Sequence, residues 1–172
     1  MATTSRARAA AADAPRRRPV DPATQALQQF RLIFKSVKKH FHWVETQTGV
    51  NGAQLWALAA VVEKPGLKVS ELARKLAIHQ STTSNLVDKL VKQKFLRRDR
   101  SSEDQRIVRL YPEPVGLRLV KSAPKPVRGV LPDSLSRLSS SELTQLIALL
   151  DCVVRNMKVR DASGRLTPLA DI

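Results

Sequence analysis

The feature of this chain that most constrains its fold lies between residues 67 and 111, where two short helical patterns precede two short apolar runs. The segment Ser70–Leu76 predicts a short helix with Ser70 at its N-cap, and residues 77–80 predict a turn. A second helix is expected to begin near Ser81, because apolar side chains recur on one face at residues 86, 87, 90 and 91. The two helices are therefore expected to pack against each other through their apolar faces.

Two strands are expected after the second helix. They cover Phe95–Asp99 and Ile107–Tyr111, and a polar loop over residues 100–106 joins them. A chain of this kind can place its second helix in the major groove of DNA and the tip of its hairpin in the minor groove. The sequence therefore predicts a mainly α fold with a small β wing, which is a winged helix-turn-helix.

The second helix carries polar side chains on the face opposite its apolar residues. Hydroxyl and amide groups lie at its start, where a recognition helix meets base edges, and lysines follow where phosphates would lie. Gln80 can hydrogen-bond adenine, as an asparagine can, or simply cap the helix. An ordinary amphipathic helix with a solvated polar face is the alternative interpretation. The residues that we expect to contact DNA here are Gln80, Ser81, Thr82, Ser84, Asn85, Lys89 and Lys92.

The distribution of charge favours a polyanion as the partner. The net charge is +15, and residues 64–109 hold twelve Lys or Arg against five Asp or Glu. Residues 1–19 hold five Arg against one Asp, so the excess coincides with the helix-turn-helix and the N-terminal tail. A basic helix with an aromatic-rich apolar face, which would favour a membrane surface, is not found in the sequence. No apolar run of about 18 residues predicts a transmembrane helix.

The chain is expected to form one domain with a tail at each end. Residues 1–22 predict a disordered basic tail, and residues 161–172 predict a flexible one. Residues 23–160 are expected to form the domain, with the winged helix-turn-helix at about residues 52–111.

Two helices near the ends of this domain carry apolar stripes that a small DNA-binding unit cannot cover. Residues 23–48 repeat apolar side chains at heptad spacing from Leu27 to Val44, and residues 139–159 follow a capping box of Ser139 and Glu142. We expect both helices to pack against those of a second copy in a homodimer. A monomeric bundle that hides the stripes internally is the alternative.

The remaining segments have less regular patterns. The helix expected over Gln54–Lys64 carries Leu55, Leu58, Ala59 and Val62 on one face. Between residues 112 and 138, prolines at 124, 126 and 132 interrupt a helical pattern, so a broken or kinked helix is expected there.

These segments resemble the MarR (multiple antibiotic resistance regulator) family of bacterial transcription regulators. The resemblance rests on Val69–Ala73, Ser81–Leu90 and the wing turn Ser102–Arg106, and it covers about residues 24–158. Gly116 falls where the family usually has a glycine. The resemblance implies a dimeric winged-helix repressor or activator, often released from DNA by a small aromatic or phenolic ligand. The chain departs from the family in its proline-rich stretch and at Lys94, where glycine is usual and a positive φ would cost about 1 kcal/mol.

The resemblance also implies roles for the wing. Arg106 is expected to enter the minor groove, and Asp104 to orient that guanidinium or a neighbouring one. A solvent-exposed turn is the alternative for this wing tip. The arginines of the preceding strand, Arg97, Arg98 and Arg100, are expected to bind phosphates or to pair with Asp99 and Glu103.

An effector cleft lined by the first two helices is a further implication of the resemblance. We expect His40, Trp43, Gln47 and Trp56 to line it, because aromatic walls with few polar groups suit a small aromatic carboxylate or phenolic ligand. Packing within a dimer core is the alternative interpretation of these side chains.

No enzyme, cofactor or metal site is expected. The sequence shows no catalytic nucleophile set, phosphate loop or paired carboxylates, and no Cys or carboxylate cluster completes a zinc set with the three histidines. The single cysteine, Cys152, excludes an internal disulfide and suits a reducing cytoplasm. A structural thiol is favoured over a redox switch there.

Two functions of different classes fit these observations. The leading hypothesis is a cytoplasmic, nucleoid-associated transcription regulator, a repressor that binds an inverted-repeat operator as a dimer and is released by a small aromatic acid. The alternative is a sequence-tolerant architectural DNA-binding protein without an effector. The polar start of the recognition helix favours the first and the charge of +15 favours the second.

Overall fold

The computed structural model describes residues 21–100, 108–158 and 163–171. Residues 1–32 and residues 33–172 form two separate units, and the tertiary packing described below lies within the second. The predicted wing tip, with Asp104 and Arg106, lies outside the described residues, and so do residues 1–20 of the N-terminal tail predicted over residues 1–22.

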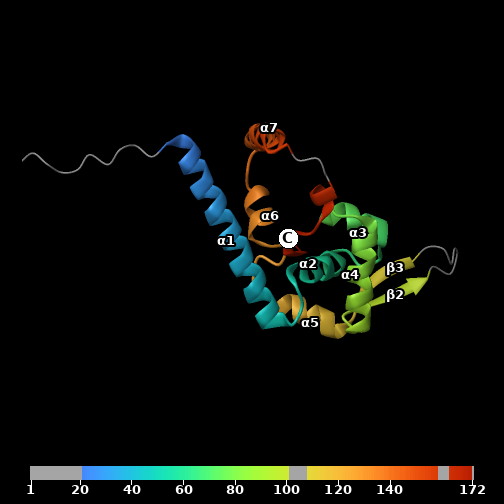
Figure 1. Cartoon of the computed structure of the whole chain (residues 1–172). Helices are drawn as coiled ribbons and strands as arrows, with labels where there is room; N and C mark the ends of the chain where they lie inside the picture. The colour runs from blue at the N-terminus through green and yellow to red at the C-terminus, as the bar shows by residue number, and fades with distance from the viewer. Residues whose placement is uncertain (1–20, 101–107, 159–162, 172) are drawn as a thin grey trace, which may run out of the picture. The chain divides into compact units, whose positions relative to one another are not determined.

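The described residues are mainly helical, with one small sheet (Figure 1), which confirms the predicted fold class. The elements are α1 (Pro22–Thr48), α2 (Gly52–Glu63), β1 (Leu67–Lys68), α3 (Val69–Leu76), α4 (Gln80–Lys92), β2 (Leu96–Arg100), β3 (Val108–Pro112), α5 (Pro114–Ser122), α6 (Val130–Leu135), α7 (Ser140–Asn156), and the 3-10 turns η1 (Ser163–Leu166) and η2 (Leu169–Asp171). None of these helices is long and apolar enough to cross a membrane.

The sheet contains the two predicted strands and one that the sequence did not predict. Its order is β1-β3-β2, and both pairings are antiparallel. The strand β2 pairs Arg98 with Leu110 of β3, while β1 pairs Leu67 with the same residue from the other side. A strand of two residues leaves too little alternation in the sequence to be recognised.

The core is built around α2, which is surrounded by α3, α4, α5 and β3 (Figure 1). The sequence placed Ala59 and Val62 on the buried face with Leu55 and Leu58, but Ala59 and Val62 are only half-buried. The fully buried residues are Leu55, Ala57, Leu58 and Val61. The prediction was too narrow because a helix packed on several sides has no solvent face to reveal in its sequence pattern.

The first helix of the helix-turn-helix begins differently from the prediction. Its N-cap is Lys68 rather than Ser70, and the Lys68 backbone N–H donates to the Glu71 carboxylate at 2.8 Å. This hydrogen bond, more than any other interaction, holds the pKa of Glu71 below its ordinary value, against a smaller opposing effect of burial. The helix ends at Leu76, and its C-cap residue Ala77 takes a left-handed conformation with φ of 55°.

The outer helices follow their local signals. The capping box predicted for α7 is present, since the Ser139 hydroxyl accepts from the Glu142 N–H at 3.3 Å and the Glu142 carboxylate accepts from the Ser139 N–H at 2.7 Å. Asp21 caps α1 by accepting from the Thr24 N–H at 3.1 Å. The helix predicted to break after residue 112 is divided into α5 and α6.

The last described segment differs from the expected flexible tail. Residues 163–171 form η1 and η2 and return to the body of the protein, where Pro168 is buried. Ala170 packs against the core cluster that contains Leu58 and Leu72. The polar composition of the segment hid this packing, because a few apolar side chains are enough to hold a short turn against a core.

Candidate nucleic-acid interface and effector cavity

The helix α4 presents the polar face that the sequence predicted. Leu86, Val87 and Leu90 are buried against the core. The opposite face exposes Gln80, Ser81, Asn85, Lys89 and Lys92, whereas Thr82 and Ser84 are half-buried. Positions 81, 85, 89 and 92 are three or four residues apart, so their side chains share one face of the helix.

Two hydroxyl groups of α4 already bond within the helix. The Thr83 hydroxyl is fully buried and donates to the His79 carbonyl at 3.0 Å. The Ser84 hydroxyl donates to the Gln80 carbonyl at 3.0 Å, so in this conformation its oxygen is left as an acceptor. Asn85 is exposed, and its side-chain amide offers a donor and an acceptor at once, which suits it to base recognition.

The charges on α4 are arranged for contact with an anion. Its first turn contains no acidic side chain, and its N-cap residue, His79, makes no side-chain capping bond. The first backbone N–H groups and the positive end of the helix dipole therefore face the outside at Gln80 and Ser81. Lys89 and Lys92 in the last turn add positive charge beyond it.

The wing strand β2 adds two arginines beside the recognition helix. Arg98 and Arg100 are two residues apart, so they share one face of the strand, and with Val69 and Val108 they line a groove of about 370 Å³. The Arg98 guanidinium also lies 2.7 Å from the Asp88 carboxylate of α4. This ion pair links the wing to the recognition helix.

The pairing of the wing arginines was only partly predicted. Arg97 pairs with Asp99, as expected, and also lies over the ring of Tyr111 at 4.8 Å. The partner of Arg98 is Asp88, which the sequence did not suggest because the two residues meet only through the packing of β2 on α4. Glu103, the other expected partner, lies outside the described residues.

A second groove lies at the turn between α3 and α4. It has a volume of about 320 Å³, and Ser70, Arg74 and Gln80 are among its lining residues. Arg74 is exposed and was not singled out from the sequence. The sequence did place Arg74 on the first helix of the pair, near the turn to the second helix. That position could have marked it as a candidate DNA contact.

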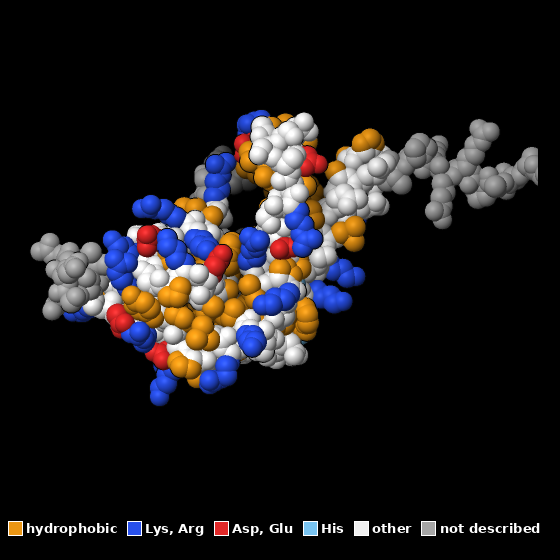
Figure 2. Space-filling view, turned by 180° about the vertical axis from the view of Figure 1, so that it is seen from behind, with side chains coloured by type: hydrophobic (Ala, Val, Ile, Leu, Met, Phe, Trp, Pro, Cys, Tyr) orange, Lys and Arg blue, Asp and Glu red, His pale blue; other side chains and the backbone are white. Residues whose placement is uncertain are grey.

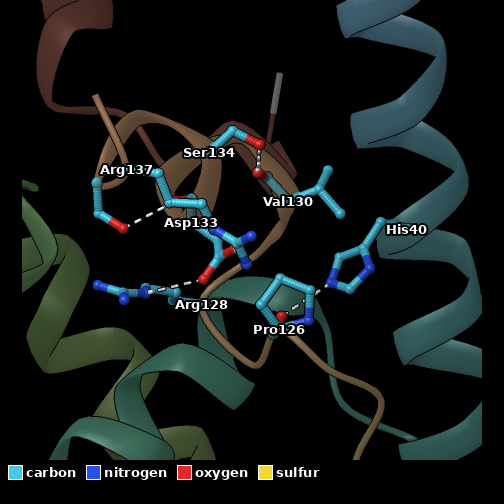
Figure 3. Close-up of polar contacts among 8 residues, drawn as sticks. His40, Pro126, Arg128, Val130, Asp133, Ser134 and Arg137 are labelled. Carbon is cyan, nitrogen blue, oxygen red and sulfur yellow. Dashed lines mark hydrogen bonds and ion pairs between the residues drawn. The ribbon is translucent and has the colours of Figure 1, made fainter. Parts of the chain in front are cut away.

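The four residues expected to line an effector cleft do not converge. His40 is buried, and its Nε2 atom lies 3.2 Å from the Pro126 carbonyl oxygen (Figure 3). Because a carbonyl only accepts, Nε2 must carry the proton. Trp43 is 49% exposed and meets the His40 ring edge-on at 6.1 Å, and Gln47 is exposed.

Trp56 lines a cavity of about 400 Å³ whose walls do not include His40, Trp43 or Gln47. The two tryptophans therefore do not converge: Trp43 is 49% exposed and does not line this cavity, whereas Trp56 lines it together with Leu76 and Ile78. The lining residues are Phe41, Gly52, Ala53, Trp56, Leu76, Ala77, Ile78, Arg128, Pro132, Leu135, Gly164, Arg165, Thr167, Pro168, Leu169 and Ala170.

Two arginines give this apolar cavity its positive charge. The Arg128 Nε atom is 3.9 Å from Asp133, whose carboxylate is also bound by Arg137 at 2.7 Å (Figure 3). Arg165 is 3.7 Å from Asp151. Both pairs are long for charged hydrogen bonds, and each guanidinium carries five N–H donors. Both arginines therefore retain donors for an anionic ligand.

The fold and the exposed recognition helix define a winged helix-turn-helix protein of the DNA-binding class. Residues 48–107 match the sequence model of the MarR family. This match confirms the resemblance that the sequence predicted, and the DNA-binding part of the chain is similar to that of MarR-family transcription regulators. Proteins of this family are regulators and not enzymes.

Two relatives of known class are similar to this chain. The uncharacterized HTH-type transcriptional regulator YsmB of Bacillus subtilis is 24% identical over 104 residues, which are 60% of this chain and 71% of that protein. The HTH-type transcriptional repressor MdtR of Bacillus subtilis is 26% identical over 80 residues, which are 46% of this chain and 52% of that protein.

Solved structures show the same fold. A MepR-like protein complexed with pseudoligands aligns with a TM-score of 0.55 at 19% identity, covering 77% of this chain and 94% of that one. The transcriptional regulator BldR of Sulfolobus solfataricus aligns with a TM-score of 0.51 at 24% identity, covering 81% and 99%.

Proposed function

We propose that this protein is a sequence-specific repressor that binds an inverted-repeat operator as a homodimer and is released by a small aromatic acid. The observation that carries the proposal is the exposed polar face of α4 beside the arginines of β2. A helix of this kind reads base edges in the major groove while a wing contacts the neighbouring backbone.

The polar residues of α4 and the wing divide into two roles under this proposal. Asn85, with Ser81 and Thr82 at the start of the helix, reads bases, and Lys89 and Lys92 bind phosphates. In the wing, Arg98 and Arg100 bind the backbone, while Arg106 enters the minor groove with Asp104 orienting it. Gln80 and Ser84 complete the surface at the helix start.

The homodimer rests on the apolar surface of α7. Ile147, Leu150 and Val154 are 59%, 38% and 38% exposed, and their spacing of three and four residues places them on one face of α7. On the side of the molecule drawn in Figure 2, hydrophobic side chains also lie at the surface among Lys and Arg. Burying such a face against a second copy stabilises a dimer by removing apolar area from water. Sedimentation of the full chain at micromolar concentration tests this; a monomer would refute the dimer.

The effector site under this proposal is the cavity beside Trp56. Its volume of about 400 Å³ lies within the range of small-molecule sites. Phe41 and Trp56 supply aromatic surface, and Arg128 and Arg165 supply positive charge for a carboxylate. A ligand bound there weakens DNA binding only if it prefers a conformation that the operator does not fit.

The DNA-binding part is tested on the DNA that flanks the protein's own gene, first by footprinting. Anisotropy titrations then compare Asn85→Ala and Arg106→Ala with Lys92→Ala on the footprinted site and on random DNA. The first two substitutions should cost about 1–3 kcal/mol on the specific site alone, whereas Lys92→Ala should weaken both complexes alike. A specific-to-random affinity ratio below about 10³ would favour the architectural alternative, which the net charge of +15 supports.

The effector part is tested with two matched variants, because the chain has only two tryptophans. In the Trp43→Phe variant, an aromatic carboxylate that releases the DNA should quench the fluorescence of the remaining Trp56. In Trp56→Phe, the remaining Trp43 should report much less change. Equal quenching in both variants would place the ligand away from this cavity.

A further inference from the structure

The C-terminal segment over residues 163–171, here named the C-terminal strap, lies against the helix-turn-helix unit. Its turn η2 contacts α2. Pro168 is buried and Ala170 packs against the main core cluster. The strap is therefore a packed part of the DNA-binding body, although it follows α7 in the chain.

The strap forms one wall of the cavity beside Trp56. Six of its residues line the cavity: Gly164, Arg165, Thr167, Pro168, Leu169 and Ala170. Leu76 at the end of α3 lines it as well, and so do Ala77 and Ile78 in the turn between α3 and α4. A molecule inside the cavity would therefore touch both the strap and the turn that precedes the recognition helix.

A backbone hydrogen bond joins the strap to the start of the recognition helix. The His79 N–H donates to the Leu166 carbonyl oxygen at 3.2 Å. His79 is the N-cap of α4, and Leu166 also lines the groove that contains Arg74 and Gln80. A shift of the strap would therefore reach the backbone from which the base-reading helix begins.

We propose that the C-terminal strap is the element that couples an aromatic anion in the cavity to the position of the recognition helix. Arg165 belongs to the strap, and Arg128 lies on the segment between α5 and α6. A carboxylate held between these two cations moves the strap, and the Leu166–His79 hydrogen bond transmits the movement to α4. The coupling rests on the proposed effector function. It is also reciprocal, so bound DNA lowers the affinity for the anion by the same factor by which the anion lowers the affinity for DNA.

The test uses the full-length protein and cinnamate as the probe, with cinnamyl alcohol as its neutral analogue. Amide hydrogen exchange at His79 follows the strap contact directly and needs no DNA. Calorimetry gives the affinity of the probe, and anisotropy gives DNA affinity with and without it.

The central variant is Ala170→Glu, which places a charge against the core and detaches the strap. In this variant, the rate of amide exchange at His79 should rise by at least about tenfold, and the affinity for cinnamate should fall by at least about tenfold. Cinnamate should no longer alter the DNA affinity of this variant. Gln145→Glu is the matched control, because it adds the same carboxylate at an exposed position that does not line the cavity; it should behave as wild type. Arg165→Gln should weaken cinnamate but not cinnamyl alcohol, and should leave His79 exchange unchanged.

Two results would overturn the coupling. The first is that Ala170→Glu changes neither the amide exchange rate at His79 nor the affinity for cinnamate. The other is cinnamate bound to the wild type without any change at the His79 amide. Failure of the proposed function has a different signature, since the wild type would then bind all DNA alike while cinnamate still altered exchange at His79.

Discussion

Replacement of Lys94 by glycine should stabilise the protein. Lys94 follows α4 with φ of 59°, and two hydrogen bonds close the turn around it. The Lys94 N–H donates to the Val91 carbonyl at 2.9 Å and the Phe95 N–H donates to the Leu90 carbonyl at 2.9 Å. This pair of bonds is the Schellman arrangement, in which glycine is the preferred residue at the left-handed position.

The expected gain follows from two opposing effects. The left-handed conformation costs an L-residue about 1–2 kcal/mol. Glycine has more conformational freedom in the unfolded chain, and this effect destabilises the folded state by about 0.4–1 kcal/mol. Lys94→Gly should therefore stabilise the fold by about 0.5–1 kcal/mol, which corresponds to a rise in Tm of about 1–4 °C for a chain of this size.

The assay is urea unfolding at one fixed protein concentration, with Lys94→Ala as the control. Both variants lose the same charge and the same exposed side chain, but only glycine relieves the left-handed backbone. The midpoint should rise for Lys94→Gly at unchanged slope, and it should not rise for Lys94→Ala. Equal midpoints for the two variants would show that the turn stores no strain at this residue.

Three further substitutions should give distinct results. Gly116→Ala should destabilise the fold by about 1–3 kcal/mol in urea unfolding, because its Cβ would lie 2.2 Å from the Phe95 carbonyl oxygen; wild-type stability would refute this. Leu58→Ala should cost about 2–5 kcal/mol, since Leu58 is fully buried, and a loss below 1 kcal/mol would contradict its central place. Because the pKa of Glu71 is lowered, its hydrogen bond to the Lys68 N–H stabilises the folded state at pH values above the ordinary pKa of 4.5. This stabilisation is lost as the pH falls below that value. Glu71→Gln keeps an acceptor for the Lys68 N–H but does not titrate, so its unfolding midpoint should depend less on pH there than that of the wild type.

Local interactions made several elements predictable from the sequence alone. The Ser139–Glu142 capping box lies within four residues and is present as predicted. The apolar face of α4 repeats at helical spacing, so Leu86, Val87 and Leu90 could be assigned to the core. Lys94, at a position where the MarR family usually has glycine, does take a positive φ. In each case the information lies within one or two turns of the chain.

Contacts between distant segments could only come from the tertiary structure. The pairing of β1 with β3, the ion pair of Asp88 with Arg98 and the packing of the strap beside Trp56 each join residues whose separation in sequence carries no periodic signal. The polar residues of α4 were thus found from the sequence, because a solvent-facing helix records its exposed face every three or four residues. The wall of the cavity was not, because segments 163–171 and 76–78 meet only when burial of a few apolar side chains brings them together.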